Sequence, residues 1–224
     1  MHLILLHSPL VGASTWAPLA DACAARGVAA HVPVLPAWTE LHPPYYPALA
    51  AAVEVGGPAC LVAHSGAGAL VPAILAEAQG LVRSVAFVDA ILPHPGRSWF
   101  ATAAPALGNA LRAAAVEGAA PAWDQWFPAG TLGGLLPDPD QRAQFLAELT
   151  PTPLAFLEEP APELVIPADV AWGYLRLSRA YEDEAGEARR VGAPTLRLDS
   201  HHLAMMTDPE PVLTALLNLM RMLG

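Results

Sequence analysis

Short apolar runs alternate along this chain with longer stretches of helical periodicity. Continuous apolar runs bounded by turn residues are typical of strands that are buried on both faces. Because helical stretches separate the runs, the pattern predicts an α/β fold, with a mainly parallel sheet of about six strands flanked by helices. The strands are expected at Leu3–Leu6, Val28–Leu35, Cys60–Val62, Ser84–Val88, Trp172–Leu177 and Thr195–Leu198.

Helices are expected at Pro18–Arg26, Ala67–Gln79 and Pro209–Met222. The last has a marked start, because Asp208 can cap it and Pro209 suits the first helical position. The strand over Val28–Leu35 is expected to end near Pro33, since proline cannot donate a ladder hydrogen bond.

The strand–helix alternation stops between Ile91 and Asp169, a stretch rich in tryptophan, phenylalanine and proline. An insertion after the fourth strand would lie over the carboxyl ends of the strands, where open α/β sheets bind ligands. We therefore predict one domain, 1–224, with a cap at about 92–169. Most of the cap aromatics are expected to fill a small second core, and the pocket below to be mainly apolar. Acidic pairs such as Glu158-Glu159 are expected on the solvated surface.

The net charge and the length of the apolar runs limit the kinds of partner that the protein is expected to bind. A formal net charge of −10 over 224 residues argues against a nucleic-acid binder, which needs a basic surface. The chain has no apolar run of about 20 residues that could span a membrane. The opening Met1–Leu6 lacks the basic segment of a secretion signal, so a cytoplasmic location is expected, with Cys23 and Cys60 as free thiols.

The segment Ala63-His64-Ser65-Gly66-Ala67 is the most informative one. A serine between a strand end and a helix start, with small residues two positions before and after it, forms a sharp turn that lifts the hydroxyl above the sheet. Alanine replaces glycine at both outer positions of this G-x-S-x-G pattern. The location after a buried strand still favours Ser65 as a nucleophile over a plain Ser-Gly turn.

A serine nucleophile needs a base, and the fold places that histidine after the last strand. His201 and His202 both follow the strand at Thr195–Leu198. Two adjacent side chains cannot both point into the site. His202 is the predicted base, and His201 is expected to shape the pocket beside it, as is His64 next to the nucleophile.

Ser65 and His202 resemble the serine and histidine of the α/β-hydrolase superfamily, in the required chain order. The first loop, from His7 through the Gly12-Ala13 pair to Trp16, is similar to that of the hydroxynitrile lyase and methylesterase branch. The resemblance implies a buried pocket for small esters or cyanohydrins, and no metal or organic cofactor.

The chain departs from the family at the oxyanion hole. The resemblance implies a backbone N–H donor two residues after His7, but Pro9 stands there and has no N–H. The N–H of Gly66 remains as a donor. We hypothesise that the Ser8 hydroxyl supplies the second one, since a lost donor costs about 10²–10³ in rate.

The triad acid is the second departure. The family usually places an aspartate just beyond the fifth strand, but only Glu182 and Asp183 lie near that point, slightly late. Asp89 ends the preceding strand, and neighbouring strand ends are about 5 Å apart. Asp89 is therefore the first choice and Glu182 the second, although either carboxylate could instead cap a helix.

Three functions remain open at this point. The leading one is hydrolysis of a small ester, thioester or lactone through an acyl-enzyme on Ser65. A lyase or cyclase would use Ser65 and His202 for proton transfer alone, and Pro9 favours it because such chemistry needs less of an oxyanion hole. A non-catalytic ligand-binding module is the third. The expected partner is a small molecule of apolar character, and a homodimer is left open.

Overall fold

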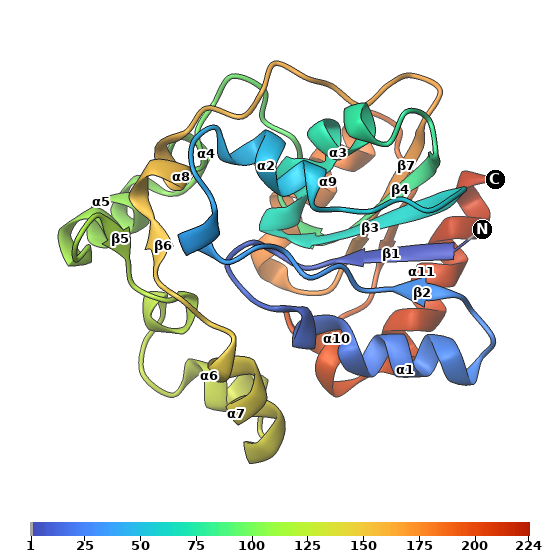
Figure 1. Cartoon of the computed structure of the whole chain (residues 1–224). Coiled ribbons are helices and arrows are strands. Elements are labelled where there is room, and N and C mark those ends of the chain that lie inside the picture. Colours follow the sequence, from blue (N-terminus) through green and yellow to red (C-terminus); the bar gives the residue numbers. More distant parts are fainter. Residues whose placement is uncertain (1) are drawn as a thin grey trace.

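The computed structural model describes residues 2–224 and contains a six-stranded sheet in which every neighbouring pair is parallel (Figure 1). This confirms the predicted α/β class. In spatial order its strands are β2 (Ala30–His31), β1 (His2–Leu6), β3 (Ala59–Ser65), β4 (Val82–Ala90), β7 (Ala171–Arg176) and β8 (Thr195–Arg197).

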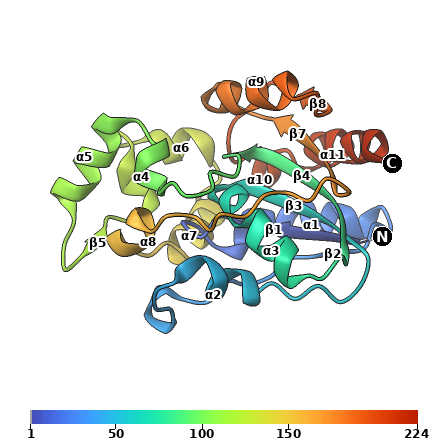
Figure 2. The ribbon, with the colours of Figure 1, turned by 90° about the horizontal axis from the view of Figure 1, so that it is seen from above.

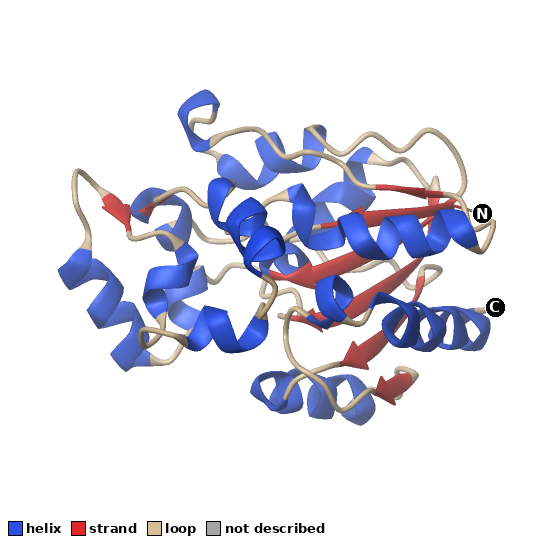
Figure 3. Ribbon diagram, turned by 90° about the horizontal axis from the view of Figure 1, so that it is seen from below, coloured by secondary structure: helices blue, strands red, loops and turns tan. Residues whose placement is uncertain are grey.

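Helices cover both faces of the sheet, which explains why its central strands are apolar throughout. All seven residues of β3 are buried, and in β4 only Arg83 is exposed. Helices α1 and α11 lie on one face and α2 and α3 on the other (Figure 1), and α11 crosses in front of the strands in Figure 3. The bounds of these four helices are α1 (Ala17–Ala25), α2 (Tyr45–Ala51), α3 (Val71–Glu77) and α11 (Pro209–Leu223). A fifth helix, α9 (Glu182–Arg190), lies at the periphery.

Short helical turns connect several of these elements. They are η1 (Ala13–Trp16), η2 (Trp38–Glu40), η3 (Gly66–Leu70), η5 (Arg179–Tyr181) and α10 (Ala204–Thr207). The predicted helix over Ala67–Gln79 is thus a 3₁₀ turn followed by α3, with Pro72 in the first turn of the α-helix, where its missing N–H is tolerated.

Two local predictions need correction. The strand predicted within Val28–Leu35 is present and ends before Pro33, as expected, but it covers only Ala30–His31, at the sheet edge with β1 as its partner. The side chain of Asp208 makes no capping bond to α11. Its carboxylate instead accepts a hydrogen bond from the Thr207 hydroxyl at 3.4 Å.

The segment between β4 and β7 leaves the sheet and lies beyond the carboxyl ends of the strands, at the end of the molecule opposite to both termini (Figures 1 and 2). Its elements are α4 (Trp99–Thr102), α5 (Pro105–Ala114), β5 (Ala119–Ala120), η4 (Trp123–Trp126), α6 (Thr131–Leu135), α7 (Pro139–Ala147), β6 (Thr152–Pro153) and α8 (Leu154–Glu158). Strands β5 and β6 pair with each other in an antiparallel ladder.

Two carboxylates of this segment form hydrogen bonds with the part of the chain that contains the sheet. Glu159 accepts hydrogen bonds from the backbone N–H groups of Tyr45 and Tyr46 at the start of α2, at 2.8 and 3.1 Å. Glu148 accepts from the Ser14 hydroxyl at 2.6 Å. Glu159 is therefore not the solvated surface residue that the sequence suggested, because a helix N-terminus offers unpaired N–H donors to a carboxylate.

No helix within residues 2–224 combines the length and the apolar character that crossing a membrane requires. Cys23 and Cys60 are both buried and carry free thiols.

Candidate active site

Ser65 occupies the last position of β3 in a strained backbone conformation, with φ 56° and ψ −127°. Positive φ is rare for a residue other than glycine and often marks a functional turn. The turn also needs small neighbours: a Cβ atom on Gly68 would lie 1.8 Å from the carbonyl oxygen of Ile91. Ser65 is only 6% exposed, so its hydroxyl lies at the top of the sheet but under other side chains.

Asp89 lies one strand away, near the end of β4, and is fully buried. Its Oδ2 atom is 2.9 Å from Nδ1 of His202. The same carboxylate accepts hydrogen bonds from the backbone N–H groups of Leu177 and Ser178, at 2.8 and 2.9 Å, and from the Ser178 hydroxyl at 2.6 Å. Burial alone would raise the pKa of Asp89, but the bonds from His202 and Ser178 outweigh it and hold the pKa below its usual value.

This contact fixes the tautomer of His202. An ionised carboxylate can only accept, so Nδ1 of His202 carries the hydrogen and Nε2 of the neutral ring is left with a lone pair. The imidazole is mostly buried, with 13% of the side chain exposed. Its free nitrogen is therefore able to take a proton.

His64 connects the turn at Ser65 to the loop that carries His202. Its Nε2 atom donates to the backbone carbonyl of His202 at 3.0 Å, and the two ring centroids are 4.4 Å apart. Burial lowers the pKa of His64 well below its usual value, so the ring is neutral. Ser65 and His202 therefore belong to one site rather than to opposite sides of the molecule.

Tyr181, which the sequence reasoning missed, lies between these groups. Its hydroxyl is 3.2 Å from Oγ of Ser65, and its ring stacks on the imidazole of His202 with centroids 4.9 Å apart and planes at 7°. Across residues 2–224 no hydrogen bond joins Ser65 directly to His202. The only sequence signal for Tyr181 was its place in the loop after β7, where the family usually carries its acid.

Ser8 and Pro9 lie on the other side of the turn at Ser65. A Cβ atom on Gly66 would be 2.7 Å from Oγ of Ser8 and 3.8 Å from Cδ of Pro9. Ser8 is buried, and its Oγ accepts a hydrogen bond from the backbone N–H of Leu10 at 3.2 Å, which leaves its own hydrogen free to donate. The first loop thus presents a hydroxyl, not a backbone N–H, beside Gly66.

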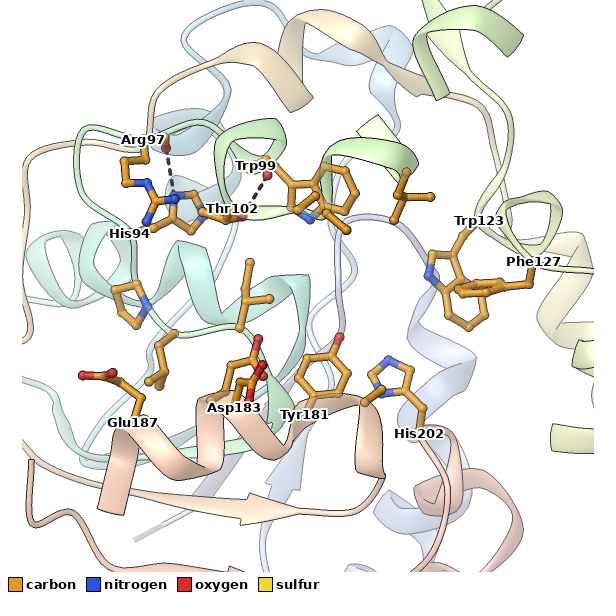
Figure 4. A pocket seen from close by; sticks show the side chains of 18 of the residues that line it. His94, Arg97, Trp99, Thr102, Trp123, Phe127, Tyr181, Asp183, Glu187 and His202 are labelled. Atoms are coloured by element: carbon orange, nitrogen blue, oxygen red, sulfur yellow. Dashed lines mark hydrogen bonds between the residues drawn. The ribbon is translucent and has the colours of Figure 1, made fainter. Parts of the chain in front are cut away.

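A cavity of about 660 Å³ opens between the cap and this site, lined by both Tyr181 and His202 (Figure 4). One end is aromatic, with Trp123 and Phe127 near His202, whereas Arg97 and Glu187 lie at the other end. The lining is mainly apolar, as predicted, but α9 adds the acidic side chains of Asp183, Glu184 and Glu187 to it. The cap aromatics divide accordingly: Phe145 and Phe156 are core residues, while Trp99, Trp123 and Phe127 line the cavity.

Comparison with known proteins agrees with this architecture. Residues 3–215 match the model of a family described as the alpha/beta hydrolase family. The chain belongs to the alpha/beta hydrolase family. No curated protein sequence matches this alpha/beta hydrolase.

Several solved structures resemble this alpha/beta hydrolase over nearly their whole length. An extracellular alpha/beta-hydrolase from a Paenibacillus species, described as a structural and functional homologue of tobacco salicylic acid binding protein 2, is 16% identical, with a TM-score of 0.74 and coverage of 100% of this chain and 99% of its own. Tomato methylketone synthase I, solved with 2-tridecanone, is 16% identical, with a TM-score of 0.72 and coverage of 100% and 98%. Polyneuridine aldehyde esterase is 16% identical, with a TM-score of 0.72 and coverage of 98% of both chains. At this identity the likeness shows the shared fold.

Two residues named from the sequence lie outside the hydrogen-bonded cluster of this alpha/beta hydrolase. The carboxylate of Glu182, half exposed, pairs with Arg176 at 2.9 Å and Arg189 at 2.8 Å, and not with His202. His201 bonds within its own loop, through Nε2 to the Thr207 hydroxyl at 3.0 Å. His201 therefore supports the loop that carries His202. Of the two histidines, only His202 is among the residues that line the cavity, so His201 does not shape the pocket as predicted.

Within residues 2–224, His, Cys, Asp and Glu side chains nowhere gather in a group of three or more that could hold a metal ion.

Proposed function

We propose that this alpha/beta hydrolase cleaves a small ester, thioester or lactone, with Ser65 as nucleophile, His202 as general base and Asp89 as the acid that orients the base. The observation that carries the proposal is the 2.9 Å contact between Asp89 and Nδ1 of His202, next to a serine held at positive φ. The likeness to an esterase and to an extracellular hydrolase supports the reaction class.

In the first step, Nε2 of His202 takes the proton of the Ser65 hydroxyl while Oγ attacks the substrate carbonyl carbon. The oxyanion that forms would accept hydrogen bonds from the N–H of Gly66 and the hydroxyl of Ser8, which replaces the donor missing at Pro9. The imidazolium then protonates the leaving oxygen or, in a thioester, the leaving sulfur. Water, activated by the same imidazole, releases the acyl group and restores Ser65.

The substrate is expected to be a small molecule with an apolar part. The aromatic end of the cavity, with Trp123 and Phe127, lies near His202 and suits an apolar acyl or alcohol group. The charged end, with Arg97 and Glu187, suits a polar substituent farther from the reacting carbonyl. The proposed chemistry requires no cofactor, and the proposed location remains the cytoplasm.

A lyase or cyclase is the second candidate. Two observations favour it: Pro9 supplies no N–H to an oxyanion, and Oγ of Ser65 is bonded to Tyr181 rather than to His202. In such an enzyme Ser65 and His202 would move protons without forming an acyl-enzyme.

A fluorophosphonate probe and an activated aryl ester separate these functions. Hydrolysis predicts rapid labelling of Ser65 together with continuous ester turnover, and both are lost in Ser65→Ala. Labelling without ester turnover would overturn hydrolysis in favour of the lyase or cyclase. A protein that is neither labelled nor active would be a ligand-binding module.

A further inference from the structure

Among residues 2–224, Tyr181 is the only tyrosine whose side chain contacts both Ser65, the proposed nucleophile, and His202, the proposed base. Its hydroxyl is 3.2 Å from Oγ of Ser65, and its ring covers one face of His202. The same side chain lines the cavity between the cap and the sheet (Figure 4). Ser65 is not among the residues that line this cavity, so a substrate held in it meets the side chains of Tyr181 and His202 before it reaches Ser65.

The phenol is a neutral donor. Burial raises the pKa of Tyr181 above its usual value, so the phenol carries its proton at neutral pH. A phenol can donate one hydrogen bond and accept others. Its hydrogen-bond partner in the structure is the hydroxyl of Ser65.

The order of the sheet decides on which side of Ser65 this donor lies. Ser65 ends β3, which has β1 on one side and β4, then β7, on the other. Ser8 follows β1, whereas Tyr181 follows β7. The two hydroxyls therefore approach Ser65 from opposite sides of its strand.

In the tetrahedral intermediate bound to Oγ of Ser65, the former carbonyl carbon carries an oxyanion and a leaving oxygen. These two oxygens need different hydrogen-bond partners. When the oxyanion faces Gly66 and Ser8, the leaving oxygen must lie within reach of His202, which protonates it. Tyr181 is stacked on His202 and within hydrogen-bonding distance of Oγ of Ser65, so its hydroxyl lies on the same side as the leaving oxygen.

We propose that Tyr181 donates a hydrogen bond to the leaving oxygen of the substrate. This bond makes esters of alcohols, or lactones, the favoured substrates of the enzyme. The inference rests on the proposed hydrolytic function. As the bond from carbon to the leaving oxygen breaks, the electron pair goes to that oxygen, and the proton that His202 took from Ser65 goes with it. Tyr181 keeps its own proton and stabilises the developing charge. Alkoxides, being strongly basic, need this help, whereas a nitrophenolate needs little.

The test is Tyr181→Phe, which removes the hydroxyl and keeps the ring on His202. The variant and the wild type are assayed on acetate esters that share the acyl group and differ in the leaving group, from p-nitrophenol to a simple alcohol. We expect kcat/KM of the variant to fall by about 10- to 100-fold for the alkyl ester, the loss of one hydrogen bond to a charged atom. For the p-nitrophenyl ester we expect a loss below about threefold, since that leaving group needs little stabilisation.

The matched control is Tyr45→Phe, which removes a hydroxyl from another buried tyrosine, packed against Trp38 and Phe156. It should behave like the wild type on every ester. Equal losses of Tyr181→Phe on all leaving groups, or no loss on any, would overturn the role of Tyr181 while leaving hydrolysis intact. Failure of the proposed function would appear differently, as a wild-type protein that forms no acyl group on Ser65.

Discussion

Replacing Asp89 with asparagine tests the orientation of the proposed base. The carboxylate accepts four hydrogen bonds, two on each oxygen: Oδ1 from the backbone N–H groups of Leu177 and Ser178, and Oδ2 from the Ser178 hydroxyl and Nδ1 of His202. Asparagine has the same size and can keep its carbonyl oxygen on the two backbone donors. Its NH₂ group then faces His202 as a donor where the carboxylate accepted.

The magnitude follows from this exchange of donor for acceptor. To bond the amide, His202 must present a lone pair at Nδ1 and carry its hydrogen on Nε2, and that tautomer cannot take the proton of Ser65. The same exchange in a serine triad lowers kcat by about 10⁴. We expect a loss of about 10³–10⁴ in Asp89→Asn, equivalent to about 4–5.5 kcal/mol of activation free energy.

The assay is steady-state hydrolysis of an activated aryl ester, with KM measured alongside kcat. KM should change little, because Asp89 is fully buried and is not among the cavity-lining side chains. Glu182→Gln is the matched control, since it neutralises the other candidate acid, and its kcat should remain within about threefold of the wild type. An Asp89→Asn variant that keeps a tenth or more of the wild-type kcat, in a folded protein, would refute this reasoning.

Three further predictions come from the same contacts. Ser8→Ala should lower kcat by about 10²-fold in the same ester assay, because it removes the proposed oxyanion donor, and full activity would exclude Ser8 from the mechanism. Gly68→Ala should yield little folded protein, judged by thermal unfolding, because its Cβ would lie 1.8 Å from the backbone oxygen of Ile91; a melting temperature equal to that of the wild type would contradict the close approach. The lowered pKa of Asp89 stabilises the fold above its ordinary value of 3.8 and ceases to do so as the pH falls below the folded-state value. Urea unfolding should therefore show a wild-type advantage over Asp89→Asn at neutral pH that shrinks at about pH 3, and a gap independent of pH would contradict the shift.

The parallel sheet explains why much of the site could be predicted. Strand ends of a parallel sheet meet at one edge, so residues that end β3 and β4 and follow β8 were expected to converge. Asp89 does contact His202 directly, and Tyr181, which stacks on His202, is hydrogen-bonded to Ser65, although these residues are far apart in the chain. The choice of Asp89 over Glu182 needed the direction in which each side chain points, and the structure places only Asp89 against His202.

Other features depended on orientation and packing that no local pattern encodes. Tyr181 lies in a polar loop, and its importance arises from the stacking of its ring on His202. The acidic wall of the cavity arises because α9 directs Asp183 and Glu187 toward the cap. Glu159 looked like a solvated residue because its partners, the N–H groups at the start of α2, are more than 100 positions away.

The most direct test of the account is to find where the acyl group resides. The protein is mixed with an activated aryl ester, quenched with acid in the first turnovers, digested and sequenced by tandem mass spectrometry. We predict an added acyl mass on the hydroxyl of Ser65, formed together with a burst of one equivalent of phenol per protein. Continuous ester turnover with Ser65 unmodified, and with Ser65→Ala as active as the wild type, would contradict it.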